Sequence, residues 1–261
     1  MASLAEQRAI LQELHDLGLA DLDALWRQAQ GFDDFYAFIV EAFPELAFEY
    51  GTMAAELSTI WYDDAAPELA YTATPAELPP FEQFAQSAQW ALNTSSGVAA
   101  LGKLSGTLQR GVWGMARQTT ILNAETEPGA RWARHASANA CEFCRMVATR
   151  KAVYTSEQSA MFVGGRGKDV STNFDENGKR KRGGQAKGVR TRGTQKLGDK
   201  FHDHCHCVAV QVRPGAKYEP PDYVAKWEQE YKDAVAATPG KGKYGAIDVQ
   251  AVQAAMRQNN K

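Results

Sequence analysis

Apolar side chains recur at three- and four-residue spacing along the first 130 residues of the chain. This spacing places them on one face of a helix, where they can pack against a neighbouring element. Two series follow closely on one another: Ile10, Leu14 and Leu17, then Leu22, Leu25 and Trp26. Asp21 precedes the second series and belongs to a residue type that favours helix N-caps, so we predict a helix beginning there. We interpret the apolar faces as helix packing rather than as a binding groove.

The helical pattern continues, with interruptions that contain proline. A further series comprises Met53, Leu57, Ile60 and Trp61. Pro44 predicts a break, because proline lacks the amide hydrogen that a helix interior needs. Residues 65–80 hold four prolines and predict a connection. Helices are expected from Phe81 and again after Ser96, the latter as one long helix or a helical pair. Its apolar face comprises Val98, Leu101, Leu104, Leu108, Val112 and Met115.

Beyond residue 130 the pattern changes to shorter segments, several of them β-branched or aromatic. The predicted elements are strand 131–134, helix 142–150, strands 152–155 and 208–212, a helix after Pro220 and Pro221, and a helix over 247–257. The strand at 208–212 is expected to return and pair with the strands before it. The fold class is therefore α+β and mainly α.

Charge divides the chain at the same place. Residues 1–130 carry five basic and eighteen acidic side chains, a formal charge of −13, whereas residues 131–261 carry 24 and 13, a formal charge of +11. We predict an acidic helical domain at 1–128, a small α+β domain at 129–216 and a C-terminal helical tail at 217–261. No apolar run approaches the ~20 residues that span a bilayer, so no membrane role is expected.

Residues 163–200 form a basic, glycine-rich arm within the small domain. Eleven basic side chains face four acidic ones, and few residues there can pack in a core. The arm has two readings: a polyanion contact, such as nonspecific binding to DNA phosphates, or a solvated segment without a fixed partner. The candidate polyanion contacts are Lys179, Arg180, Lys181, Arg182, Lys187, Arg190 and Arg192.

All four cysteines and three of the five histidines lie in two short clusters on either side of this arm. The first is Cys141-Glu-Phe-Cys144, and the second is His202-Asp-His204-Cys205-His206-Cys207. Thiolate sulfur at about 2.3 Å and imidazole nitrogen at about 2.0 Å are the ligands of tetrahedral zinc. We therefore predict a structural zinc ion that staples the small domain at the base of the arm.

The second cluster offers more ligands than one ion can use. If residues 202–207 turn tightly, His202 and Cys205 repeat the spacing of the first pair. In an extended segment the cysteines and histidines would face opposite sides, which suits a mixed site less well. We predict the ligands to be Cys141, Cys144, His202 and either Cys205 or Cys207. His204 and His206 are then expected at the surface or in hydrogen bonds.

Two other readings of the cysteines stay open. Disulfides belong to oxidising compartments, but charged residues near the start of the chain interrupt any apolar run typical of a secretory signal: Glu6, Arg8, Glu13 and Asp16. A thioredoxin-like redox pair is the other alternative, although no strand-helix-strand pattern surrounds Cys141 and Cys144.

Three segments carry a resemblance to a known family. They are Arg131-Trp-Ala-Arg134, CEFCRMVATRKAVYTS from Cys141 to Ser156, and FHDHCHCVAV from Phe201 to Val210. Together they resemble the signature block of the MuF-like minor head proteins of tailed bacteriophages, in their actinobacteriophage branch. The family's H-x-x-C-x-C motif corresponds to His202, Cys205 and Cys207. The resemblance covers residues 131–214, and Trp61 to Asp64 adds a weaker match in the helical half.

The resemblance implies a non-enzymatic minor structural protein carried in a few copies inside the phage head. Such a protein associates with the portal and other head proteins and assists head assembly, DNA packaging or ejection. The expected location is the virion, preceded by the host cytoplasm during assembly. DNA contact through the basic arm would be nonspecific.

Two enzymatic alternatives are weighed against this role. A zinc-stapled, metal-dependent nuclease acting on phage DNA would use His204 or His206 as a general base. A structural site with four protein ligands leaves no open position for water, however, and only Asp203 adds a carboxylate nearby. A capsid maturation protease is the second alternative, but the chain lacks Gly-x-Ser-x-Gly and shows no evident Ser/His/Asp order.

Overall fold

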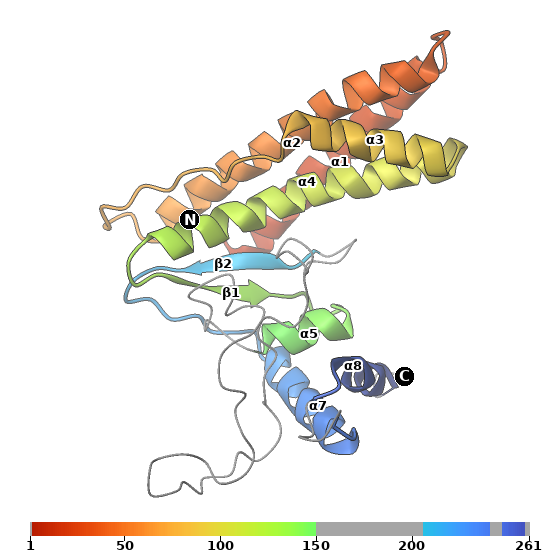
Figure 1. The fold of residues 1–261 in the computed structure, drawn as a ribbon. Helices are drawn as coiled ribbons and strands as arrows, with labels where there is room; N and C mark the ends of the chain where they lie inside the picture. The colour runs from red at the N-terminus through yellow and green to blue at the C-terminus, as the bar shows by residue number, and fades with distance from the viewer. Residues whose placement is uncertain (1, 150–205, 241–246, 259–261) are drawn as a thin grey trace, which may run out of the picture.

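A computed structural model describes residues 2–149, 206–240 and 247–258 (Figure 1). Its first part is a bundle of four helices: α1 (Leu4–Ala29), α2 (Phe35–Asp64), α3 (Phe81–Thr94) and α4 (Gly97–Thr126). Its second part lies along the α4 side of the bundle. This second region consists of strands β1 (Arg131–His135) and β2 (Val208–Val212) and helices α5 (Glu142–Ala148), α7 (Tyr223–Ala237) and α8 (Val249–Gln258).

The described residues thus form seven helices and one two-stranded antiparallel sheet, and the chain is mainly helical as predicted. The strand predicted at 152–155 and the basic arm at 163–200 lie outside the described residues. The three-part domain division stays a prediction. In the part of the chain that the structure describes, no helix combines the length and apolarity needed to cross a membrane.

Helix α1 begins where the sequence offers a complete capping box. The Ser3 hydroxyl accepts from the Glu6 amide, and the Glu6 carboxylate accepts from the Ser3 amide at 2.7 Å. The predicted helix start at Asp21 is wrong, because α1 passes through this residue without interruption. The Asp21 carboxylate instead accepts a hydrogen bond from the Tyr50 hydroxyl at 2.6 Å, which joins α1 to α2.

The break predicted at Pro44 is also wrong. Helix α2 continues through Pro44, whose side chain is buried. A proline inside a helix removes one backbone hydrogen bond and costs about 3 kcal/mol. Here the surrounding apolar burial offsets that loss, since Phe43 and Ala47 are fully buried in the bundle core.

The packed face of α2 combines small side chains with most of the series predicted for it, because Met53 and Leu57 pack, partly buried, against the core. Trp61 is buried as expected, but Ile60 is 55% exposed. The small buried residues of α2 are Ala47, Gly51, Ala54, Ala55 and Ser58. Because they are small, neighbouring elements approach α2 closely: a Cβ on Gly51 would lie 3.1 Å from Leu78 Cδ2. The spacing of large apolar residues therefore indicated the packed face except at Ile60.

Helix α4 is one continuous helix of 30 residues. The later members of its predicted face are buried, from Leu104 to Met115. Val98 is 85% exposed, contrary to prediction, because it lies in the first turn, next to the turn between α3 and α4 at the far end of the bundle (Figure 1). The buried part of α4 is the part that faces both the bundle and the second region.

Strands β1 and β2 pair in antiparallel register from Arg131 opposite Val212 to His135 opposite Val208. The predicted pairing of 208–212 with the strand before the arm is therefore confirmed. Val208 and Val210 pack in the bundle core, whereas Ala209 packs with Trp132 on the other side, as the two-residue period of a strand requires. A two-stranded sheet is marginal alone, so its cover of helices stabilises it.

Candidate metal centre

Helix α5 positions the first cysteine pair. Cys141 is the N-cap of α5, with an extended backbone, and its carbonyl accepts from the Arg145 amide at 2.9 Å. Cys144 lies in the first turn of the helix, one turn after Cys141. The Cys-x-x-Cys spacing thus spans the start of a helix, which brings two thiols to the same end of one element.

Strand β2 positions the cysteine of the second cluster. Cys207 directly precedes β2, where Val208 pairs with His135. Cys207 and Cys144 are 3% and 2% exposed and belong to one packed cluster, which Cys141 borders. The other buried members of this cluster are Ala136, Ala140, Ala148, Val224 and Trp227. Pairing of β1 with β2 and the packing of α5 and α7 therefore bring three of the five predicted ligands together.

The other two predicted ligands, His202 and Cys205, lie outside the described residues, as do all seven candidate polyanion contacts in the arm. Within the described ranges, no group of three or more Cys, His, Asp or Glu side chains is arranged to hold a metal ion. The donor chemistry fits zinc, because thiolates are zinc ligands and two of the three thiols are shielded from water. The zinc centre and its complete ligand set stay predictions.

A stripe of three buried α4 residues holds the second cysteine segment against the bundle. Gln109, Trp113 and Arg117 are spaced by four and so share one face of the helix. The Arg117 Nε donates to the Cys207 carbonyl at 2.7 Å. The Trp113 ring stacks on the His206 ring, with centroids 4.9 Å apart and planes inclined by 6°. We call these three residues the α4 stripe.

Gln109 also contacts His206. Its side-chain Nε2 lies 2.6 Å from His206 Nε2. The two groups are therefore within hydrogen-bonding distance. The hydrogen-bonding role predicted for His206 is therefore met by a residue of the bundle. The sequence analysis did not predict the α4 stripe. The available signal was the spacing of Gln109 and Arg117, two long polar residues that lie four positions before and after Trp113.

A cation from α1 also acts on the surroundings of the cysteines. Burial raises the pKa of Tyr223, the Cys207 side chain adds to this rise, and Arg8 opposes it. Burial lowers the pKa of His135, and Arg8 lowers it further. The Tyr223 hydroxyl donates to the Ala136 carbonyl at 2.8 Å, beside the cysteine cluster.

A second buried polar group joins the bundle to β2. The Glu127 carboxylate, just beyond α4, binds Arg213 at two points, with Nε 2.6 Å from one oxygen and Nη2 3.0 Å from the other. Arg213 Nη1 also donates to the Tyr62 carbonyl at 2.6 Å, and the Tyr62 hydroxyl donates to Glu127 at 2.8 Å. Burial, followed by this bond to Glu127, raises the pKa of Tyr62. We call Tyr62, Glu127 and Arg213 the junction network.

The junction network continues into the connection between α2 and α3. Asn123 accepts from the Tyr71 hydroxyl at 2.8 Å and from the Thr74 amide at 2.9 Å, and it donates to the Thr74 carbonyl. The Arg213 guanidinium lies over the Tyr62 ring, 4.6 Å from its centroid. Sequence reasoning missed these partners as well, because no local spacing links residues 62, 127 and 213.

Comparison with known proteins gives one family. A family model described as VG15 protein matches residues 1–234. This match includes the bundle, both cysteine clusters, the sheet and most of α7. No curated protein and no solved structure matches the chain.

Proposed function

The chain belongs to the VG15 protein family, and we propose that it is a non-enzymatic minor structural protein of a tailed-phage head. In this proposal it is a MuF-like protein that associates with the portal and assists head assembly, DNA packaging or ejection. It would reside in the virion and, during assembly, in the host cytoplasm. The resemblance of residues 131–214 to MuF-like proteins supplies the identity.

The observation that carries the proposal is the burial of the cysteine segments between the bundle and α7. Cys144 and Cys207 pack among alanines, Val224 and Trp227, and the backbone of Cys207 is hydrogen-bonded to Arg117. Thiols in such a place suit a site that holds elements together, because an open catalytic position needs access for water and substrate. This supports a structural role for the cluster.

Zinc would act here as a structural cofactor. Cys141 and Cys144 would supply ligands from the start of α5, and Cys207 from the residue before β2. His202 would supply a further ligand, and Cys205 is the alternative to Cys207, as their spacing predicts. The ion would cross-link the start of α5 to the segment before β2, and the residues themselves would contribute no reaction step.

The two halves of the chain would meet different partners. The bundle belongs to the acidic half and would contact head proteins, whereas the basic arm would contact DNA without sequence specificity. Arm contact with phosphates predicts steep loss of DNA affinity with salt, because each neutralised phosphate releases a counterion. Binding of the bundle to head proteins is expected not to require DNA.

Capture by purified portal protein tests the proposal. We expect the full-length chain to bind the portal in size-exclusion chromatography and calorimetry, and to be present in purified heads by mass spectrometry. A variant with Lys179, Arg180, Lys181 and Arg182 changed to Ser should lose DNA binding but keep portal binding. Absence of the protein from heads, together with no binding to the portal, would refute the proposal.

The nuclease alternative has its own experiment. Supercoiled plasmid is incubated with the full-length protein and divalent zinc, magnesium or manganese, and nicking is followed on a gel. We expect no cleavage. Cleavage that disappears in the His204→Ala variant, while the folded content stays the same, would replace the structural proposal by the enzymatic one.

A further inference from the structure

One long stretch of the bundle sequence contains no basic residue. Residues 28–102 contain no Lys, Arg or His, but they contain eleven Asp and Glu side chains. This stretch covers all of α2, the connection 65–80 and α3. A formal charge of −11 over these elements produces a negative field that repels nucleic acids and other acidic surfaces and attracts cations.

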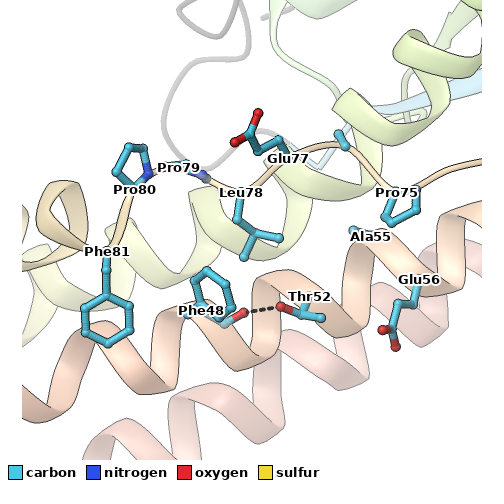
Figure 2. A pocket seen from close by; sticks show the side chains of 11 residues that line it. Phe48, Thr52, Ala55, Glu56, Pro75, Glu77, Leu78, Pro79, Pro80 and Phe81 are labelled. Atoms are coloured by element: carbon cyan, nitrogen blue, oxygen red, sulfur yellow. Dashed lines mark hydrogen bonds between the residues drawn. The ribbon is translucent and has the colours of Figure 1, made fainter.

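A groove is lined by residues of this acidic stretch, between α2 and the end of the connection (Figure 2). Its volume is about 380 Å³. Most of its large lining side chains are apolar: Phe48, Pro75, Leu78, Pro79, Pro80 and Phe81. Phe48 and Phe81 are each 40% exposed, and their ring centroids are 6.1 Å apart. Apolar side chains thus remain open to water, and two carboxylates, Glu56 and Glu77, also line the groove.

The groove is fixed by contacts that do not depend on an occupant. Figure 2 shows Leu78 pointing from the connection toward α2, where its Cδ2 would meet a Cβ on Gly51 at 3.1 Å. The Ala76 amide donates to Thr119 Oγ1 at 3.1 Å, which ties the connection to α4. Pro79 and Pro80 restrict the backbone between these anchors and Phe81. A preformed groove loses little conformational freedom when it binds.

We propose that this groove is the docking site of a cationic segment of a partner protein. The segment would place an aliphatic or aromatic side chain against Phe48 and Phe81, and Lys or Arg side chains beside Glu56 and Glu77. The charged residues that line the groove are both acidic, so a cationic segment complements it. The inference rests on the proposed function only in taking the partner to be a head protein.

Binding of a defined peptide tests the docking site directly. The probe is a short amidated peptide in which lysines alternate with leucines and phenylalanines, measured by fluorescence anisotropy with the full-length protein. Glu56→Lys and Glu77→Lys should each weaken binding about fivefold at low salt, and less at high salt. The matched control is Glu13→Lys on the exposed side of α1, which should change binding less than about twofold.

The apolar part of the site has a matched pair of aromatic variants. Phe81→Ala should weaken peptide binding about tenfold, because it removes one wall of the groove. Trp90→Ala removes a more exposed aromatic side chain that does not line the groove, and it should leave binding unchanged. Circular dichroism checks that each variant keeps its helix content.

The outcomes separate this inference from the proposed function. Peptide binding that depends on Glu77 and Phe81 supports the groove, even if the portal protein does not bind and the head role fails. Portal binding that Phe81→Ala, Glu56→Lys and Glu77→Lys leave unchanged, together with equal loss of peptide binding in Glu13→Lys, overturns the groove and keeps the head role. A peptide of residues 179–192 that binds the groove more tightly than the probe overturns the assignment to a partner.

Discussion

The bundle and the second region are stabilised in different ways. The bundle has helices of up to 30 residues around a continuous apolar core. The second region has strands of five residues and a seven-residue helix α5, and directional contacts connect them: Arg145 pairs with Glu230, Arg257 with Glu142, and Arg213 with Glu127. Short elements bury too little apolar surface to fix their own arrangement. The comparison indicates that directional contacts supplement small apolar clusters in the second region, whereas one large apolar core dominates the bundle.

Removal of the predicted zinc should give the largest difference in stability between the two regions. Structural zinc supplies on the order of 10 kcal/mol of apparent folding free energy in small domains. We therefore expect a chelator to unfold the second region while the bundle keeps its helical circular dichroism signal. Hydrogen exchange would show lost protection in β1, β2 and α5 and retained protection in α2 and α4.

Elemental analysis gives the control for this prediction. Protein purified under reducing conditions should contain about one zinc per chain, and Cys144→Ala should reduce that content and mimic the chelator. The matched variant Ala148→Ser changes another buried residue of the same cluster without removing a thiol. Metal-free protein with full protection of β1 and β2 would contradict the staple.

The junction network should give the next largest effect. Arg213 is buried and makes two contacts to Glu127, so Arg213→Ala leaves an uncompensated carboxylate. We expect a loss of about 3–5 kcal/mol in the free energy of unfolding, measured by urea denaturation. Arg131→Ala, at the exposed first position of β1, should cost less than about 0.5 kcal/mol. A double variant, Glu127→Gln with Arg213→Met, should recover part of the loss; no recovery would show that the two side chains act separately.

The bundle could be predicted from sequence in outline, because its helices follow local periodicity. Three of the errors there share one cause. At Asp21, Pro44 and Ile60 a local preference was overruled by packing between helices: Tyr50 uses the Asp21 carboxylate, burial offsets Pro44, and small residues replace Ile60 on the packed face. Such preferences are worth about 1–3 kcal/mol, which tertiary contacts of a long buried helix can outweigh.

The candidate site could be predicted only in part. Residue chemistry and spacing indicated the cysteines, and the structure brings Cys141, Cys144 and Cys207 together. The residues that hold Cys207, such as Arg117, come from 90 positions away along the chain, so no local pattern connects them. Long-range hydrogen bonds of this kind depend on the fold, and a single sequence does not encode them in a readable spacing.

Acid should weaken the second region before the bundle. Burial lowers the pKa of His135, whose Nδ1 lies 3.1 Å from the Tyr218 hydroxyl. The unfolded chain then binds more protons than the folded one, so this stabilisation is complete above pH about 6.5 and falls as the pH drops toward the folded pKa. The slope is at most about 1.4 kcal/mol per pH unit. His135→Gln keeps a hydrogen-bond acceptor and should flatten the pH dependence of urea denaturation; an unchanged slope would assign it to other groups.

Two glycines of the bundle give the smallest and most discriminating effects. Gly18 lies where α1 meets α2 and α4: a Cβ there would lie 3.1 Å from Leu108 Cδ2 and 3.2 Å from the Tyr50 ring, which Asp21 holds in place. Gly102 on α4 has nothing within 4 Å of the same position. Gly102→Ala should therefore stabilise the protein by about 0.5–1 kcal/mol, through helix propensity alone. Gly18→Ala gains the same propensity but overpacks the crossing, so a net loss of about 1 kcal/mol is expected. Equal thermal shifts for both variants would mean that the bundle core adjusts freely, and that close packing does not distinguish it from the second region.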